Sequence, residues 1–136
     1  MAEWLTWFAL SLWLGAMGFF SFVVAPTVFQ ALDGESAGRF LRTVFPRYYL
    51  FGAGCSLVLV LAALIAPTAG GWVLAGGVAL AALALGSLAL VPAINRARDA
   101  GGAGAQRFRR LHGASVALNI VALLVAVGVS IALVRA

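Results

Sequence analysis

The feature that most restricts the fold is a run of 48 residues without a charged side chain, from Tyr48 to Asn95. A second uncharged run covers residues 4–32, and a third apolar run covers residues 111–134. One membrane-spanning helix needs about 20 consecutive apolar residues. Only 10% of the chain is charged, whereas a soluble domain has roughly a quarter. The pattern excludes a water-soluble globular protein and predicts an all-α integral membrane protein.

We predict four transmembrane helices packed as one bundle, in a single membrane domain over residues 1–136. Pro67, Thr68, Gly70 and Gly71 divide the 48-residue run into two spans. The first run is long enough to reach about 43 Å as a helix, so it should tilt, kink at Pro26 or project from the bilayer. The expected spans are residues 4–32, 48–66, 71–94 and 111–134.

The two longer connections are predicted to differ in structure. Residues 33–47 should form a short interfacial helix between spans one and two, with Ser36 as its N-cap and Pro46 near its end. Its apolar side chains fall on one helical face and its arginines on the other. The glycine-rich residues 99–105 should form a flexible loop between spans three and four.

The arginines predict the orientation of the chain in the membrane. Short loops rich in arginine stay in the cytoplasm, and only Arg135 lies on the opposite side. We therefore predict a multi-pass protein of the cell (inner) membrane with both termini outside and the two arginine-rich loops cytoplasmic. The loop arginines are Arg39, Arg42, Arg47, Arg96, Arg98, Arg107, Arg109 and Arg110.

These arginines also bear on partners. The net charge of +5 could indicate a nucleic-acid partner. Most arginines flank the predicted spans, however, so we expect the anionic lipid headgroups of the bilayer to be their partners. We expect the arginines to serve topology and lipid contact. A funnel that attracts an anionic substrate is the alternative.

Polar and small side chains form stripes on single faces of the spans, and these stripes should face the bundle interior. We expect spans one, two and four to line the interior, with span three facing lipid. Packing is the simpler role for Ser115, which is also a candidate ligand or pathway residue. His112 and Asn119 are candidates for ligand binding or proton transfer. The stripe of span four is Phe108, His112, Ser115, Asn119, Ala122, Ala126 and Ser130. The stripe of span one is Trp4, Trp7, Ser11, Gly15, Gly18, Phe22 and Phe29.

Span two adds an interior face of Tyr48, Gly52, Cys55, Ala62 and Ala66. Gly15, Gly18 and Gly52 are expected to permit close helix packing, and Tyr48 and Ser11 join the candidates for a ligand site or pathway. Cys55 is most simply a buried packing residue. Cys55 and His112 are weak metal candidates, since one chain supplies too few soft ligands for a site.

Three strings together resemble the bacterial members of the transmembrane protein 205-like family, a domain of unknown function with four predicted spans. The strings are WLGAMGFFSFVVAPTVFQAL, AGRFLRTVFPRYY and PAINRARDAGGAGAQRFRRLHGASVALN. Asn95 is one of the positions that carry the resemblance, and we add it to the candidate ligand residues. The first string is also distantly similar to the copper-resistance D proteins and to the four-helix protoporphyrinogen oxidase, which place histidines around haem or metal. This chain has one histidine, so a haem held by two histidines would require a dimer.

The residue inventory argues against several activities. No lysine is present for Schiff-base chemistry, and all four acids lie outside the apolar runs, which disfavours a carboxylate-driven pump. We predict no catalytic residue and no cofactor. Haem or a metal is left open as an alternative, and its binding site would need ligands from a second subunit. The favoured function is binding or translocation of a small molecule or ion in a homo-oligomeric bundle. The alternatives are a structural or assembly protein and a haem-associated redox enzyme that uses His112.

Overall fold

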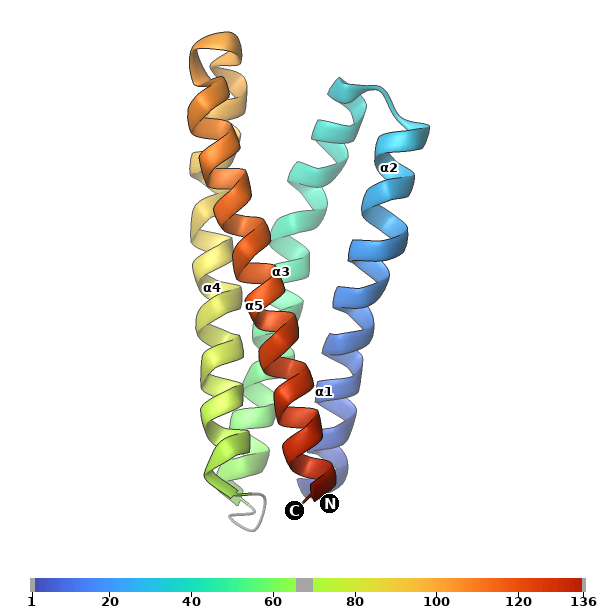
Figure 1. The fold of residues 1–136 in the computed structure, drawn as a ribbon, viewed down its shortest axis with the longest axis vertical. Helices are drawn as coiled ribbons and strands as arrows, with labels where there is room; N and C mark the ends of the chain where they lie inside the picture. The colour runs from blue at the N-terminus through green and yellow to red at the C-terminus, as the bar shows by residue number, and fades with distance from the viewer. Residues whose placement is uncertain (1, 66–69, 136) are drawn as a thin grey trace.

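A computed structural model describes residues 2–65 and 70–135, and every element in these two ranges is a helix (Figure 1). The first rod has three parts, α1 (Ala2–Phe19), the π-helix η1 (Phe20–Val24) and α2 (Ala25–Ala31). The others are α3 (Gly34–Ile65), α4 (Gly70–Asp99) and α5 (Ala105–Arg135), with a short 3₁₀-helix, η3 (Gly101–Gly104), before α5. The turn predicted at Pro67 and Thr68, and the predicted interior residue Ala66, lie outside the described residues.

All four rods are long and apolar enough to cross a membrane, which confirms the all-α four-helix bundle and the multi-pass membrane protein. Helices α3, α4 and α5 have 32, 30 and 31 residues. At 1.5 Å per residue each is about 45 Å long, which exceeds a hydrocarbon core of about 30 Å. The helices therefore extend beyond the predicted spans, chiefly at the end that carries the loop arginines, which we call the arginine end.

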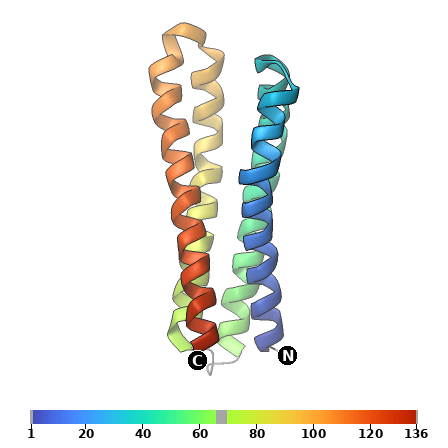
Figure 2. The same ribbon diagram turned by 45° about the vertical axis from the view of Figure 1, so that its right-hand side comes forward.

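The rods form a ring in which α1 packs on α3, α3 on α4, α4 on α5 and α5 on α1. Neighbours run antiparallel, so the turns α2–α3 and α4–α5 both lie at the arginine end while both termini lie at the other end (Figure 1). Toward the arginine end the α4–α5 pair separates from the α2–α3 pair, as Figure 2 also shows. We call the end with the termini, where the backbones lie close together, the closed part, and the end where the helix pairs diverge the open part.

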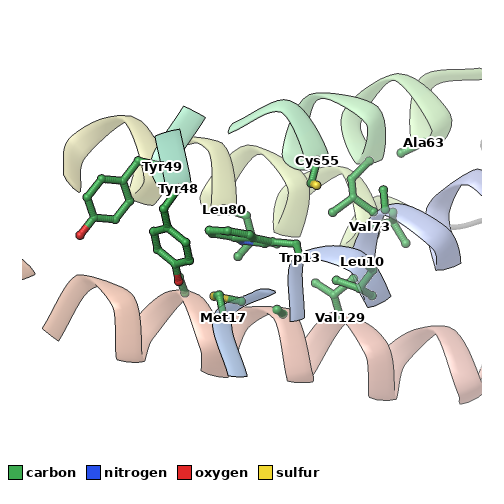
Figure 3. Close-up of a cluster of buried hydrophobic side chains, with 14 of the residues drawn as sticks. Leu10, Trp13, Met17, Tyr48, Tyr49, Cys55, Ala63, Val73, Leu80 and Val129 are labelled. Carbon is green, nitrogen blue, oxygen red and sulfur yellow. The ribbon is translucent and has the colours of Figure 1, made fainter. Parts of the chain in front are cut away.

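The closed part is built around Trp13 of α1, whose side chain is only 2% exposed (Figure 3). Its indole lies directly over Gly52 of α3, where a Cβ atom would overlap the ring. Glycines also permit close contact elsewhere, with Gly76 of α4 beneath Val129 of α5. Helices in lipid associate through such close van der Waals packing, since lipid tails are as apolar as the side chains. At Gly52 and Gly76 the absence of a side chain makes room for a large side chain of a neighbouring helix.

The interior stripe predicted for span one is wrong for the single chain. Trp4, Phe22 and Phe29 are 65%, 76% and 61% exposed, and nothing lies within 4 Å of a Cβ at Gly15 or Gly18. Ser11, Trp7 and Gly15 are exposed as well. In lipid an apolar outer surface costs nothing, so small and aromatic residues do not mark the inner face of a helix. The buried residues of α1 are Thr6, Ala9, Leu10, Trp13 and Met17.

The prediction that span three faces lipid is also wrong. Helix α4 packs along both α3 and α5, and its row of buried residues runs from Val73 to Ala97. The buried side chains are mostly aliphatic, with Ser87 as the polar one. Polar side chains do not mark this buried face, because aliphatic side chains pack as well inside the bundle as they do against lipid.

Residues 33–47 do not form a separate interfacial helix. From Gly34 onward they are the first turns of α3, which continues through Pro46 into the span. Proline lacks an N–H, so it removes one bond from the helix ladder without ending the helix here. The cap is Asp33 and not Ser36, because the Asp33 carboxylate accepts the backbone N–H groups of Glu35 and Ser36 at 3.0 and 2.9 Å. These bonds lower the pKa of Asp33.

The glycine-rich connection is a compact turn and not a flexible loop. Gly101 has φ +59°, a left-handed conformation that glycine adopts without strain. Residues Gly101–Gly104 form η3, and Gly104 is buried against the last turn of α4. The turn thereby fixes the end of α4 relative to the start of α5.

Candidate functional site

A cavity of about 340 Å³ lies in the open part of the bundle, between the first rod, α3 and α5. We call it the membrane cavity. Its volume falls within the range of pockets that bind small molecules. The walls are mainly aromatic and aliphatic. They comprise Phe20, Ser21, Phe22, Ala25, Phe29, Leu41, Phe45, Tyr48, Tyr49, His112, Ser115, Val116, Asn119, Ile120 and Leu123.

The cavity has a rim of exposed apolar side chains. Phe22 and Phe29 stand on the first rod, and Val116 and Ile120 face them from α5. All four are more than 40% exposed in the single chain. Because these residues lie along membrane-spanning helices, the rim opens sideways toward lipid tails and not along the axis of the bundle.

Polar groups converge on the inner wall of this apolar cavity. The Tyr48 hydroxyl donates to Asn119 Oδ1 at 2.8 Å, and Asn119 Nδ2 donates to Ser21 Oγ at 3.4 Å. Tyr49 and Ser115 share a buried hydroxyl–hydroxyl bond of 2.9 Å. These five residues, the polar cluster, join the first rod, α3 and α5. Figure 3 shows the hydroxyl of Tyr48 directed at α5.

The π-helix η1 places Ser21 in this cluster. Within η1 the Ala25 N–H bonds to the Phe20 carbonyl, five residues back instead of four. The next residue, Pro26, has no N–H to donate, which favours this local rearrangement of the ladder. Such π segments insert one residue into a helix and occur frequently at functional sites. Here the segment carries Phe20, Ser21 and Phe22, which all line the membrane cavity.

Replacing Asn119 with leucine is expected to lower the free energy of unfolding by about 1 kcal/mol, because two interhelical hydrogen bonds are lost. Tyr48→Phe removes one of them and should cost about half as much. Reversible unfolding in mixed micelles measures both values. Ser130→Ala is the control, since among the described residues Ser130 bonds only to the Ala126 carbonyl of its own helix. If Asn119→Leu unfolds like the wild type, the cluster does not hold the helices together.

The structure brings together four of the residues proposed from the sequence, namely Tyr48, His112, Ser115 and Asn119, which all line the membrane cavity. Ser11 lies apart from them on the exposed face of α1. Tyr49 and Ser21 belong to the site although sequence reasoning missed them. The sequence features that point to them are the Tyr48–Tyr49 pair at the start of span two, and a serine five residues before Pro26.

The weak metal candidates do not converge. Cys55 belongs to the apolar core, whereas His112 is exposed, lines the cavities and stacks on Phe108 with the ring planes 6° apart. Within residues 2–65 and 70–135, no group of three or more His, Cys, Asp or Glu side chains is placed to hold a metal ion.

Asn95 and the arginines lie toward the arginine end, and only some face a cavity. Asn95, Arg42 and Arg98 line a second cavity of about 280 Å³ next to the first. Arg39 pairs with Glu35 on the outer face of α3, and Arg47 donates to the Thr43 carbonyl of its own helix. The exposed arginines outside both cavities are Arg39, Arg47, Arg96, Arg107, Arg109 and Arg110.

Comparison with known proteins gives two matches over most of the chain. An uncharacterized protein of Aquifex aeolicus (strain VF5) is 33% identical over 128 residues, which cover 94% of this chain and 93% of that protein. No solved structure matches. Residues 8–103 match a family model described as "Domain of unknown function (DUF4149)", and this range contains α3, α4 and the first rod from Phe8 onward. The chain therefore belongs to the DUF4149 family.

Proposed function

We propose that the protein binds a small amphipathic molecule, taken from the surrounding bilayer, in the membrane cavity. The observation that carries this proposal is a cavity of about 340 Å³ with apolar walls and a single polar cluster. Pockets for small molecules combine these properties, because apolar walls supply affinity and a few polar groups supply orientation. The exposed rim supports entry from lipid.

The position of the arginines supports a particular orientation. Eight of the nine arginines lie at or near the arginine end, with Arg135 at the other. Arginine-rich ends of membrane proteins face the cytoplasm. In this orientation the membrane cavity lies in the cytoplasmic half of the bilayer of the cell membrane, and ligands come from the inner leaflet. Transport across the membrane, assembly as a homo-oligomer and the finer resemblance to the transmembrane protein 205-like family remain predictions.

A photoreactive hexadecanol, with a diazirine in its chain, tests the binding proposal on the purified protein in nonionic maltoside micelles. We expect saturable labelling that unlabelled hexadecanol displaces and that maps to the walls of the membrane cavity. Val116→Trp places a large ring in the cavity mouth and should reduce labelling at least about tenfold, the equivalent of ~1.4 kcal/mol.

Val121→Trp is the matched control for this experiment. Val116 and Val121 lie on the same helix and are both 45% exposed, but only Val116 lines the cavity. Labelling of the Val121→Trp variant should equal that of the wild type. Labelling that does not saturate, or that is equal in both variants, would show that the probe only coats the apolar surface.

A further inference from the structure

The second cavity, which we call the arginine cavity, is open to a different kind of chemical group. It is lined by Phe29 of the first rod and by residues of α3, α4 and α5 at the arginine end. Its polar lining consists of Arg42, Asn95, Arg98 and His112, and within the described part of the chain no acidic side chain lines it. Two guanidinium groups and an amide make this wall a donor surface for an anion.

Arg98 is held in place by three contacts with two other helices, α3 and α5. Its Nη2 donates to the Gly34 carbonyl at 3.0 Å, and its guanidinium lies 5.8 Å from the centroid of the Phe108 ring. The guanidinium also packs against Gly38, where a Cβ would stand 2.6 Å from Cζ. A cationic group fixed in this way loses little further freedom when it binds an anion, which strengthens binding.

Arg42 is held on the facing wall by a bidentate pair with Asp99, the last residue of α4. The pair uses two of the five N–H groups that a guanidinium carries. Both partners are partly exposed, with side-chain values of 36% and 59%, so the pair is weak enough to be rearranged by a competing anion.

The two cavities adjoin each other. Both are lined by Phe29, Leu41, Phe45 and His112. The arginine cavity lies nearer the arginine end, because its lining includes Gly38, Arg98 and Phe108, which do not line the membrane cavity. We propose that the ligand is an anionic amphiphile, with a phosphate or carboxylate head between Arg42 and Arg98 and its apolar chain in the membrane cavity. This assignment rests on the proposed function and adds the head group to it.

Two photoreactive probes with the same chain test the assignment, hexadecyl phosphate and hexadecanol, on the full chain in nonionic micelles. We expect the phosphate probe to bind at least about tenfold more tightly, because charge-assisted hydrogen bonds to two arginines are stronger than those to a hydroxyl. Inorganic phosphate alone should compete weakly. Equal affinity of the two probes would refute an anionic head site, and full competition by inorganic phosphate would refute an amphiphile.

Substitutions at the ion pair separate binding from structure, because Arg42→Gln and Asp99→Asn both break the pair. Arg42→Gln should weaken binding of hexadecyl phosphate about tenfold through the loss of a charged donor. Asp99→Asn should instead strengthen it about threefold, since it releases Arg42 from an exposed ion pair. Arg47→Gln, on α3 but outside the cavity, should leave affinity unchanged. Changes of the same sign in Arg42→Gln and Asp99→Asn would contradict the proposal.

Unlabelled competitors distinguish the source of the anionic head. Palmitate supplies a carboxylate on one chain, and phosphatidylglycerol supplies a phosphodiester on a membrane lipid. The competitor that displaces hexadecyl phosphate at the lower concentration identifies the head group, and displacement by neither would refute the assignment. Val116→Trp could abolish labelling by both probes while Arg42→Gln affects neither. The membrane cavity would then bind amphiphiles irrespective of their head group, so the proposed function would stand and the anionic head site would be refuted.

Discussion

Replacing Gly52 with alanine is expected to lower the free energy of unfolding by about 3 kcal/mol, because the added methyl group enters a filled core. A Cβ at this position would overlap the six-membered ring of Trp13. The indole has no room to retreat, since it is 2% exposed and packed against the rings of Tyr48 and Phe51. Helices α1 and α3 would have to separate. Unfolding in mixed micelles, followed by tryptophan fluorescence, measures the loss.

Gly54→Ala is the matched control on the same helix. Nothing lies within 4 Å of a Cβ at Gly54, so this variant should be unchanged or more stable by up to roughly 1 kcal/mol, as expected for alanine in a helix. Trp13→Phe should partly rescue Gly52→Ala, and the two sites should couple by at least about 1 kcal/mol. The indole Nε1 has no hydrogen-bond partner among the described residues, so phenylalanine loses no bond there. Equal stability of Gly52→Ala and Gly54→Ala would rule out this packing.

Gly104→Ala is expected to cost about 3 kcal/mol through a clash that side-chain rotation does not relieve. The added Cβ would overlap the backbone carbonyl of Ala97 in the last turn of α4. Relief requires that this turn unwinds or that η3 moves away, and either change displaces Arg98 and Asp99. The variant should therefore also lose affinity for hexadecyl phosphate. Thermal unfolding and probe binding measure the two effects on one preparation.

Gly102→Ala controls for the loss of a glycine from the same turn. A Cβ at Gly102 has no neighbour within 4 Å, so stability and probe binding should both stay near the wild-type values. If Gly104→Ala behaves like Gly102→Ala, the α4–α5 turn does not position the arginine cavity.

The sequence was sufficient to predict the membrane bundle and its four helices, because long apolar runs have few other folded solutions. It was not sufficient to predict which helix faces are buried. Trp13 and Leu80 pack in the core while Trp4 and Leu85 lie outside, although composition does not distinguish them. In lipid the burial of an apolar side chain depends on the shape of the neighbouring helix, as Gly52 illustrates for Trp13.

Polar residues were more informative than apolar ones for the site. Asn119, Ser115 and Tyr48 were predicted to face the interior because an unpaired polar group in lipid costs energy, and the structure pairs all three. Ser21 was missed because its position depends on the π-helix. The sequence also did not show which arginines line a cavity. Arg42 and Arg98 line the same cavity because α3 and α4 pack side by side, and this packing cannot be derived from the sequence of either helix.

The exposed apolar rim of the membrane cavity determines which concentration governs its occupancy. A molecule that enters between Phe29 and Ile120 arrives from the leaflet, so its effective concentration is its mole fraction among the lipids. A compound that is scarce in water but abundant in the bilayer would fill the cavity. Occupancy would then follow changes in membrane composition, with no change in the amount of protein and no soluble messenger.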